Sequence, residues 1–225
     1  MNFSKNIAEH YDTISDRFDI SRVRIWNNVK KFITNTDINK NKLLLDAGCG
    51  NGKNSVYALD YNYNIIGIDI STKLLEISQK KGLTVYNKDL LELNYIDLFD
   101  KCICIAVIHH INSLDLQCEA IINMINSLKK NRELLISVWS HEKINILENE
   151  EEIQKTKKDY RDFVIGHNYI DWIIDKKKNE VSKRYYYIHD YKSFVNLIEM
   201  VNNIIKIKYE ISWEKQNWFC KIIKI

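Results

Sequence analysis

Three glycines at alternate positions, Gly48, Gly50 and Gly52, form the part of this chain that is best suited to bind a ligand. They follow a short apolar run, LLLDA, in which Asp46 stands near the end of the expected strand. Because glycine has no β-carbon, a glycine-rich loop lets its backbone approach a ligand closely. The pattern therefore predicts a strand and a loop that together bind a nucleotide-like cofactor.

The spacing of the glycines indicates which cofactor this would be. The dinucleotide motif GxGxxG would place its third glycine at position 53, where this chain has Lys53. The offset favours S-adenosylmethionine over NAD. Asp69 ends the next apolar run, IIGID, where a second acid could bind ribose hydroxyls. The residues expected at the cofactor site are Asp46, Gly48, Cys49, Gly50, Asn51, Gly52, Asp69, Ile70, Asp89, Leu90 and Ala106.

Two of these acids have an alternative interpretation. Asp69 and Asp89 each follow an apolar run and each precede a stretch that could form a helix. The carboxyl ends of parallel strands meet at one edge of a sheet, so both side chains could face the ligand there. They could instead cap the N-termini of the helices that follow. The sequence leaves both interpretations open.

A pair of histidines, His109 and His110, follows the apolar run CICIAVI. In this fold class that position lies at the edge of the sheet where a transferred group would meet its acceptor. We therefore expect His109 to contact the substrate, although one member of such a pair could pack in the core or cap a helix. No third residue has the spacing of a metal ligand, so no metal site is expected.

The elements that must position these residues alternate between short apolar strands and amphipathic helices, which predicts an α/β fold with a doubly wound parallel sheet. Strands are expected at 43–47, 64–69, 83–87, 100–107 and 132–139, with helices at 53–60, 72–81 and 115–129. Two N-terminal helices are expected within 5–35, the second with Val23, Trp26 and Val29 on one face. A strand at 184–188, a helix at 191–201 and an antiparallel hairpin of 204–211 and 218–225 should close the chain.

The composition predicts one domain over residues 1–225, since 225 residues with 45% hydrophobic content suffice for one well-buried core. Its expected parts are an N-terminal helical arm (1–40), a cofactor-binding core (41–140), an insertion (141–183) and C-terminal strands (184–225).

Charge and cysteine content bear on partners and location. The net charge of +3 is small, so a nucleic acid would have to be bound by local patches. Five cysteines without CxxC spacing predict reduced thiols, with Cys102 and Cys104 on one face of a buried strand. No signal peptide or membrane span is expected, which predicts a cytoplasmic protein.

Segments along nearly the whole chain resemble the tRNA methyltransferases that esterify 5-carboxymethyluridine at the wobble position. They are HYDTISDRFDISRVRIW, DAGCGNGK, GIDIS, FDKCICIAVIHHINS, ISVWS, RYYYIHDYKSF and QNWFCKIIK. The first and the last lie outside the cofactor core and are the most specific. The resemblance implies a class I methyltransferase with a seven-stranded sheet, S-adenosylmethionine as methyl donor and the tRNA anticodon loop as substrate.

The resemblance also implies roles for individual residues. Arg22, His109, Arg184 and Asn217 would act on the target nucleotide, and Tyr11, Trp26, Trp139, Tyr185 and Trp218 would bind it or support the site. The tryptophans could equally be core aromatics. A substrate carboxylate is ionised at neutral pH, so it needs positioning rather than a general base. An arginine suits that task, and Arg22 or Arg184 is expected to perform it.

Partners and alternatives remain open at this point. Lys176 to Lys178 in the insertion could contact RNA or form a solvated face. Members of the resembled family work with a small zinc-binding activator subunit that pairs with the sheet edge near the glycine loop. The alternatives are a methyltransferase for a small carboxylic acid and a non-catalytic scaffold. Strongly salt-dependent tRNA binding would be expected of a tRNA methyltransferase and of neither alternative.

Overall fold

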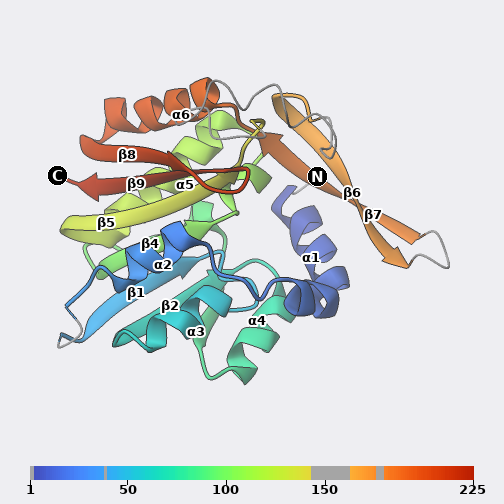
Figure 1. The fold of residues 1–225 in the computed structure, drawn as a ribbon, viewed down its shortest axis with the longest axis horizontal. Helices are drawn as coiled ribbons and strands as arrows, with labels where there is room; N and C mark the ends of the chain where they lie inside the picture. The colour runs from blue at the N-terminus through green and yellow to red at the C-terminus, as the bar shows by residue number, and fades with distance from the viewer. Residues whose placement is uncertain (1–2, 38–39, 143–162, 176–179) are drawn as a thin grey trace.

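The structure is a computed structural model that describes residues 3–37, 40–142, 163–175 and 180–225. The main sheet of this described part has seven strands in the order β3-β2-β1-β4-β5-β9-β8 (Figure 1). β1 to β5 run parallel to one another, whereas β9 is antiparallel to both β5 and β8. The predicted doubly wound sheet with a C-terminal antiparallel hairpin is confirmed. The strands are β1 (Lys42–Ala47), β2 (Tyr63–Asp69), β3 (Thr84–Asn87), β4 (Phe99–Ile105), β5 (Leu128–Trp139), β8 (Ile207–Trp213) and β9 (Asn217–Lys224).

Helices cover both faces of this sheet, and successive strand residues point to opposite sides. Leu44 belongs to the apolar cluster beneath α2, whereas Leu45 belongs to the cluster beneath α5 and α6. Cys102 and Cys104 are both buried in the second cluster, as predicted. None of the helices described is both long and apolar enough to cross a membrane. The helices are α1 (Phe3–Ser21), α2 (Asn27–Thr34), α3 (Lys53–Leu59), α4 (Thr72–Lys80), η1 (Leu90–Glu92), η2 (Ile108–His110), α5 (Leu114–Ser127) and α6 (Tyr191–Ile204).

A second sheet, formed by β6 (Gly166–Asp175) and β7 (Glu180–Ile188), stands beside α1 and projects away from the main sheet (Figure 1). The sequence predicted an insertion over 141–183 and a strand only at 184–188, so it missed β6 and the first half of β7. The run GHNYIDWIID mixes polar and apolar residues and did not resemble a buried strand. Lys176 to Lys178 lie outside the described residues.

The second N-terminal helix begins later than the sequence predicted. Residues 22–26 form no regular structure, and α2 starts at Asn27. The prediction that Val23 lies on a buried helix face is wrong, because Val23 is 76% exposed. Val29 is buried as expected. The irregular segment allows Trp26 to lie at the start of α2 with an extended backbone.

One buried lysine holds the end of α2 against the sheet. Lys101 on β4 is 6% exposed, and its Nζ donates hydrogen bonds to the carbonyl oxygens of Phe32 (2.5 Å) and Asn35 (2.8 Å). The same Nζ lies 3.5 Å from a carboxylate oxygen of Glu133. The last carbonyls of a helix have no partner within the helix, so a buried cation there satisfies them and complements the helix dipole.

We predict that Lys101→Met lowers the free energy of unfolding by about 2–3 kcal/mol, because it leaves buried carbonyls and Glu133 without a donor. Urea denaturation measures this change. Lys130→Met is the matched control, since Lys130 on β5 is exposed and should change stability by less than about 0.5 kcal/mol. Equal stability of the two variants would show that Lys101 does not hold α2.

Candidate functional site

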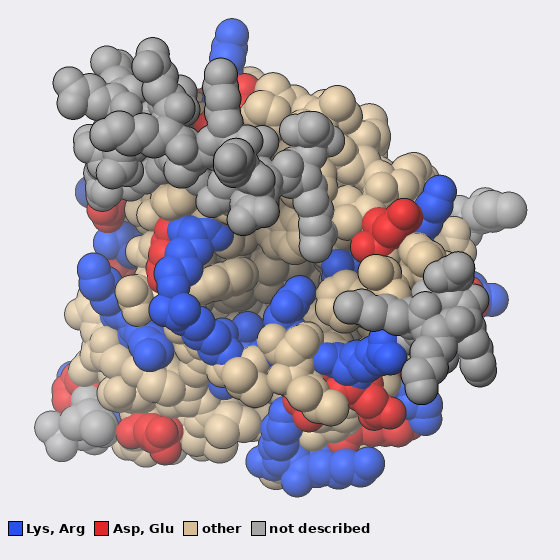
Figure 2. Space-filling model, turned by 45° about the vertical axis from the view of Figure 1, so that its right-hand side comes forward, with Lys and Arg blue, Asp and Glu red and all other residues tan. Residues whose placement is uncertain are grey.

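A cavity of about 890 Å³ lies at the carboxyl edge of the main sheet, between α1, the β6–β7 hairpin and the ends of β1, β2 and β4. The strand order reverses between β1 and β4, so the chain leaves these neighbours toward opposite faces and a crevice forms between them. Figure 2 shows the hollow face of the molecule with lysine and arginine side chains around it.

The glycine loop forms one wall of this cavity and is held against the end of β2. The amides of Gly48 and Cys49 both donate to the carbonyl oxygen of Ile68, at 2.8 Å and 2.9 Å. Gly48 has a φ of +78°, and a β-carbon there would lie 2.3 Å from a methyl group of Val107. Only glycine fits this position without displacing neighbouring atoms.

Asp69 at the end of β2 fixes the same loop through its carboxylate. Its Oδ2 accepts a hydrogen bond from the amide of Gly50 (2.8 Å), and its Oδ1 accepts one from the amide of Ser71 (2.9 Å). Burial raises the pKa of Asp69, and these two amide donors oppose that rise. Each oxygen retains a lone pair that could accept a ligand hydroxyl.

Asp89 and Asp46 have different environments. Asp89 caps η1 by accepting from the amide of Leu91 (3.0 Å), and it also lines the cavity, so its two interpretations are compatible. Asp46 is 1% exposed and accepts a hydrogen bond from the hydroxyl of Ser55 (2.6 Å). Burial raises the pKa of Asp46 to about 7. Asp46 therefore holds α3 from beneath the loop and does not reach the cavity.

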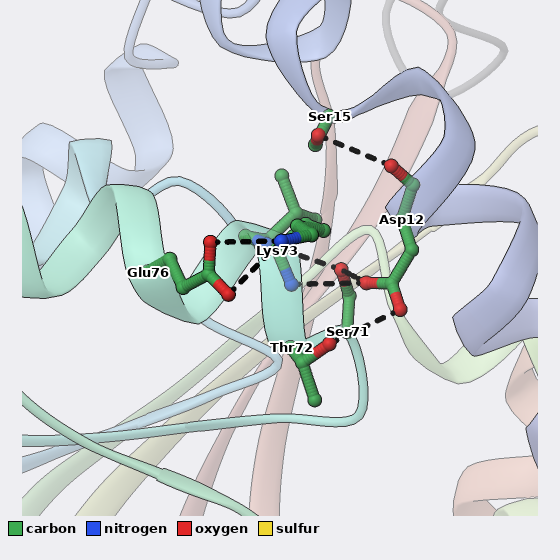
Figure 3. A network of polar contacts seen from close by, with 7 residues as sticks. Asp12, Ser15, Ser71, Thr72, Lys73 and Glu76 are labelled. Atoms are coloured by element: carbon green, nitrogen blue, oxygen red, sulfur yellow. Dashed lines mark hydrogen bonds and ion pairs between the residues drawn. The ribbon is translucent and has the colours of Figure 1, made fainter.

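Helix α1 contributes side chains to the cavity wall and is anchored to the start of α4 by Asp12 (Figure 3). Asp12 Oδ1 accepts from the hydroxyl of Ser71 (2.6 Å) and the amide of Lys73 (3.0 Å), and Oδ2 accepts from the hydroxyl of Thr72 (3.2 Å). These groups form the N-terminus of α4, where a negative charge is favourable. One side chain of α1 thus caps a helix of the core.

Both members of the histidine pair line the cavity, and both are buried. His109 Nδ1 accepts from the amide of Trp139 (3.1 Å), which leaves its proton on Nε2. His110 Nδ1 lies 2.8 Å from the carbonyl oxygen of Tyr185 and Nε2 lies 2.8 Å from the hydroxyl of Tyr11, so the imidazole donates to Tyr185 and accepts from Tyr11. Burial lowers the pKa of His110 to about 3 and that of His109 well below its ordinary value. Both rings are therefore neutral at physiological pH.

Arg184 on β7 is the cation at the far wall of the cavity. It is 2% exposed, its Nε has no hydrogen-bond partner, and no acid among the described residues forms an ion pair with it. Its guanidinium carbon lies 4.4 Å from the ring centre of Trp172 and 5.2 Å from that of Tyr186. Arg22 lies 5.7 Å from the same Trp172 ring. Among the described residues, the charge of Arg184 is therefore contacted by aromatic rings and not by an acid.

Two aromatic residues at this site were not predicted. Tyr186 stacks on Trp139 at a centroid distance of 4.3 Å and lines the cavity, whereas Tyr185 faces Phe3 on the opposite side of β7. Tyr186 therefore takes the place at the cavity that was predicted for Tyr185. Strand alternation alone accounts for this difference, because adjacent residues of a strand point to opposite faces. Trp172 belongs to β6, and no sequence signal identified that strand.

Most of the predicted site residues surround this cavity. Asp46, Gly52, Tyr185 and Trp218 do not line it: Gly52 is the N-cap residue directly before α3, and Trp218 is fully buried with its Nε1 donating to Glu142 (2.9 Å). Among the described residues, no three His, Cys, Asp or Glu side chains are grouped so that they could hold a metal ion. The predicted residues that line the cavity are Tyr11, Arg22, Trp26, Gly48, Cys49, Gly50, Asn51, Asp69, Ile70, Asp89, Leu90, Ala106, His109, Trp139, Arg184 and Asn217.

Curated relatives carry names that agree with this arrangement. A tRNA (carboxymethyluridine(34)-5-O)-methyltransferase of Arabidopsis thaliana is 34% identical over 139 residues, which are 61% of this chain but only 33% of that protein. A protein of the same name from Schizosaccharomyces pombe is 25% identical over 230 residues, covering 95% of this chain and 93% of its own. The chain thus spans about a third of the first relative and nearly all of the second.

Solved structures share the fold. The crystal structure of Burkholderia thailandensis 1,6-didemethyltoxoflavin-N1-methyltransferase, with bound 1,6-didemethyltoxoflavin and S-adenosylhomocysteine, matches 99% of this chain and 88% of its own at a TM-score of 0.65 and 12% identity. A family model described as a methyltransferase domain matches residues 38–193, more than half of the chain. With the sheet order and glycine loop described above, this match shows that the chain belongs to the class I S-adenosylmethionine-dependent methyltransferases.

Proposed function

We propose that this enzyme transfers a methyl group from S-adenosylmethionine to the carboxylate of 5-carboxymethyluridine at the wobble position of tRNA, which gives the methyl ester. The observation that carries the proposal is Arg184, a buried cation at the cavity wall without an acid partner among the described residues. An unpaired buried charge is costly, and an anionic substrate group would relieve that cost. The names of the two relatives support the same acceptor.

The residues on the sheet side of the cavity fit the cofactor. Gly48 and Gly50 leave backbone surface that no β-carbon covers, and the Asp69 carboxylate can accept ribose hydroxyls beside its two amide contacts. Asp89 and Leu90 form the adjacent wall. When bound, S-adenosylmethionine supplies a methyl group on a positively charged sulfur. These side chains would hold the cofactor and determine which way it faces.

On the acceptor side, the residues position a group that is already reactive. A carboxylate is ionised at neutral pH, so no residue has to remove a proton from it. Arg184 can bind one carboxylate oxygen in a fixed plane and leave the other free to attack. Neutral His109 carries its proton on Nε2, where it can donate a hydrogen bond. Such positioning lowers the activation barrier by up to about 7–11 kcal/mol.

A second unsatisfied atom suits a uracil ring. Asn217 Nδ2 donates to the carbonyl oxygen of Lys215 (2.8 Å), whereas its buried Oδ1 has no hydrogen-bond partner. Oδ1 is an acceptor, and the N3–H group of uracil is a donor. Trp139 stacks on Tyr186 nearby and offers an aromatic surface for a base. A carboxymethyluracil would thus match one free acceptor and one free cation.

We further propose a small zinc-binding activator subunit as partner, on the basis of the sequence resemblance. β3 is an edge strand of the main sheet, and its Tyr86 is 51% exposed. An edge strand has unpaired backbone groups that a partner strand could pair with. This supports a partner at that edge.

The proposed function predicts first that the chain, alone or with such an activator, esterifies the wobble nucleoside of a tRNA that carries the free carboxymethyl group. Mass spectrometry of the nucleosides after incubation with the methyl donor measures the product. A small carboxylic acid offered in place of tRNA should not be methylated. If the tRNA gains no ester in the presence of activator, while calorimetry shows bound cofactor, the proposal is contradicted.

The second prediction concerns which arginine binds the carboxylate. Arg184→Gln should lower kcat/KM for the tRNA about 10- to 100-fold, since it removes a charged hydrogen bond to the substrate. Arg184→Lys keeps the charge and should recover part of this activity. Cofactor affinity, measured by calorimetry, should stay unchanged and reports that the variants are folded. If Arg22→Lys has the larger effect, Arg22 rather than Arg184 binds the carboxylate.

The third prediction concerns the cofactor. Asp69→Asn should raise the Kd for S-adenosylmethionine about tenfold or more, because one oxygen becomes an amide donor that faces another donor. Asp60→Asn is the control, since Asp60 is exposed at the end of α3 and does not line the cavity. Equal Kd values for the two variants would exclude Asp69 from the cofactor site.

A further inference from the structure

Three basic residues from separate segments meet at one side of the cavity mouth. Arg24 lies between α1 and α2, Lys53 begins α3, and Lys215 lies in the turn between β8 and β9. All three line the cavity together with Trp26. We call these three residues the cationic lip. The hollow face in Figure 2 has basic side chains around its opening.

Short-range contacts hold the lip together around Trp26. Lys53 Nζ lies 5.4 Å from the centre of the Trp26 ring and donates to the carbonyl oxygen of Arg24 (3.1 Å). The turn that carries Lys215 is fixed by its neighbour Glu214, whose carboxylate accepts from the amides of Asn27 and Asn28 at 2.9 Å and 2.8 Å. The lip is therefore a consequence of how three segments pack.

The basic side chains of the lip are not paired with acids among the described residues. None of its members forms an ion pair there, and Glu214 is engaged by backbone amides. Several basic residues elsewhere are paired with acids, as the contacts of Lys81 with Asp19, Lys129 with Asp100 and Lys224 with Asp97 illustrate. Burial lowers the pKa of Lys53, and the nearby Arg22 lowers it further, whereas the buried Asp46 opposes this shift. Like charges that form no ion pair still repel one another, and an anionic ligand at the lip would offset that repulsion.

The exposure of the lip indicates what kind of anion it receives. Arg24 and Lys215 are exposed, and their side chains form no hydrogen bond within the described chain. Trp26 beside them is only half-buried, so the exposed part of its ring lies next to two exposed cations. Aromatic rings interleaved with basic residues are characteristic of surfaces that bind single-stranded nucleic acid.

We propose that the cationic lip binds backbone phosphates of the RNA next to the target nucleotide. The identification of the anion as RNA rests on the proposed function. The lip would distinguish tRNA from a free carboxylic acid, because a small acid could occupy the Arg184 pocket but would not reach the lip. Substrate selection would thus depend on two separate groups of cations, one for the carboxylate and one for the phosphates.

The test compares two double variants of the full chain that remove the same amount of positive charge. Arg24→Gln with Lys215→Gln removes two exposed members of the lip. Lys80→Gln with Lys130→Gln removes two exposed lysines outside the cavity that form no described ion pair. Binding of an anticodon stem-loop RNA is measured by fluorescence anisotropy over a range of salt concentrations, and cofactor binding is measured by calorimetry.

The lip variant should reduce the slope of log Kd against log salt by about 1.4, because each phosphate that is no longer neutralised lowers the slope by about 0.7. It should raise KM for tRNA without changing kcat or cofactor affinity. Equal slopes in the two variants would overturn the proposal, and so would a weaker cofactor affinity in the lip variant. A wild-type chain that binds RNA through the lip but forms no ester would refute the proposed function alone.

Discussion

The site depends on the close contact between the glycine loop and the end of β2. Two consecutive amides of the loop donate to the carbonyl oxygen of Ile68, and the next residue, Asp69, accepts from the loop at Gly50. This contact brings the backbone of the loop against β2 and directs the Asp69 carboxylate toward the cavity. The left-handed backbone at Gly48 and the packing of Val107 against it follow from the same contact. The hydrogen bonds between the glycine loop and β2 therefore position both the start of α3 and the cavity wall beside the loop.

The sequence predicted the main sheet well because its strands are short apolar runs between strongly patterned helices. Buried parallel strands contain few polar residues, as the run from Phe99 to Ile105 illustrates, and such runs are recognisable without structural knowledge. The hairpin of β6 and β7 has one face toward the cavity, where Ile170 is 6% exposed. Its opposite face is only partly exposed, since Tyr169 is 68% exposed but Tyr185 is buried against Phe3. Its sequence lacks a continuous apolar run, so β6 was missed.

The candidate site also has a part that sequence patterns identify and a part that they do not. The cofactor half was predicted from spacing, and only Asp46 and Gly52 fall behind the cavity wall, because the loop folds over them. The acceptor half came from the resemblance, which placed Arg184, His109 and Asn217 at one cavity but could not show which face of β7 points inward. Tyr186 rather than Tyr185 lines the cavity for that reason. Trp172, which lies against two arginines, carried no signal at all.

The β6–β7 hairpin stands outside the main sheet, and this has an evolutionary consequence. Arg184, Tyr186 and Trp172 belong to an element that shares no strand pairing with β1 or β2, where the cofactor loop begins. Substitutions in the hairpin can therefore change this wall of the cavity without disturbing the loop. A cavity wall attached outside the main sheet can diverge while the glycine loop stays unchanged, so that one fold can carry different sites.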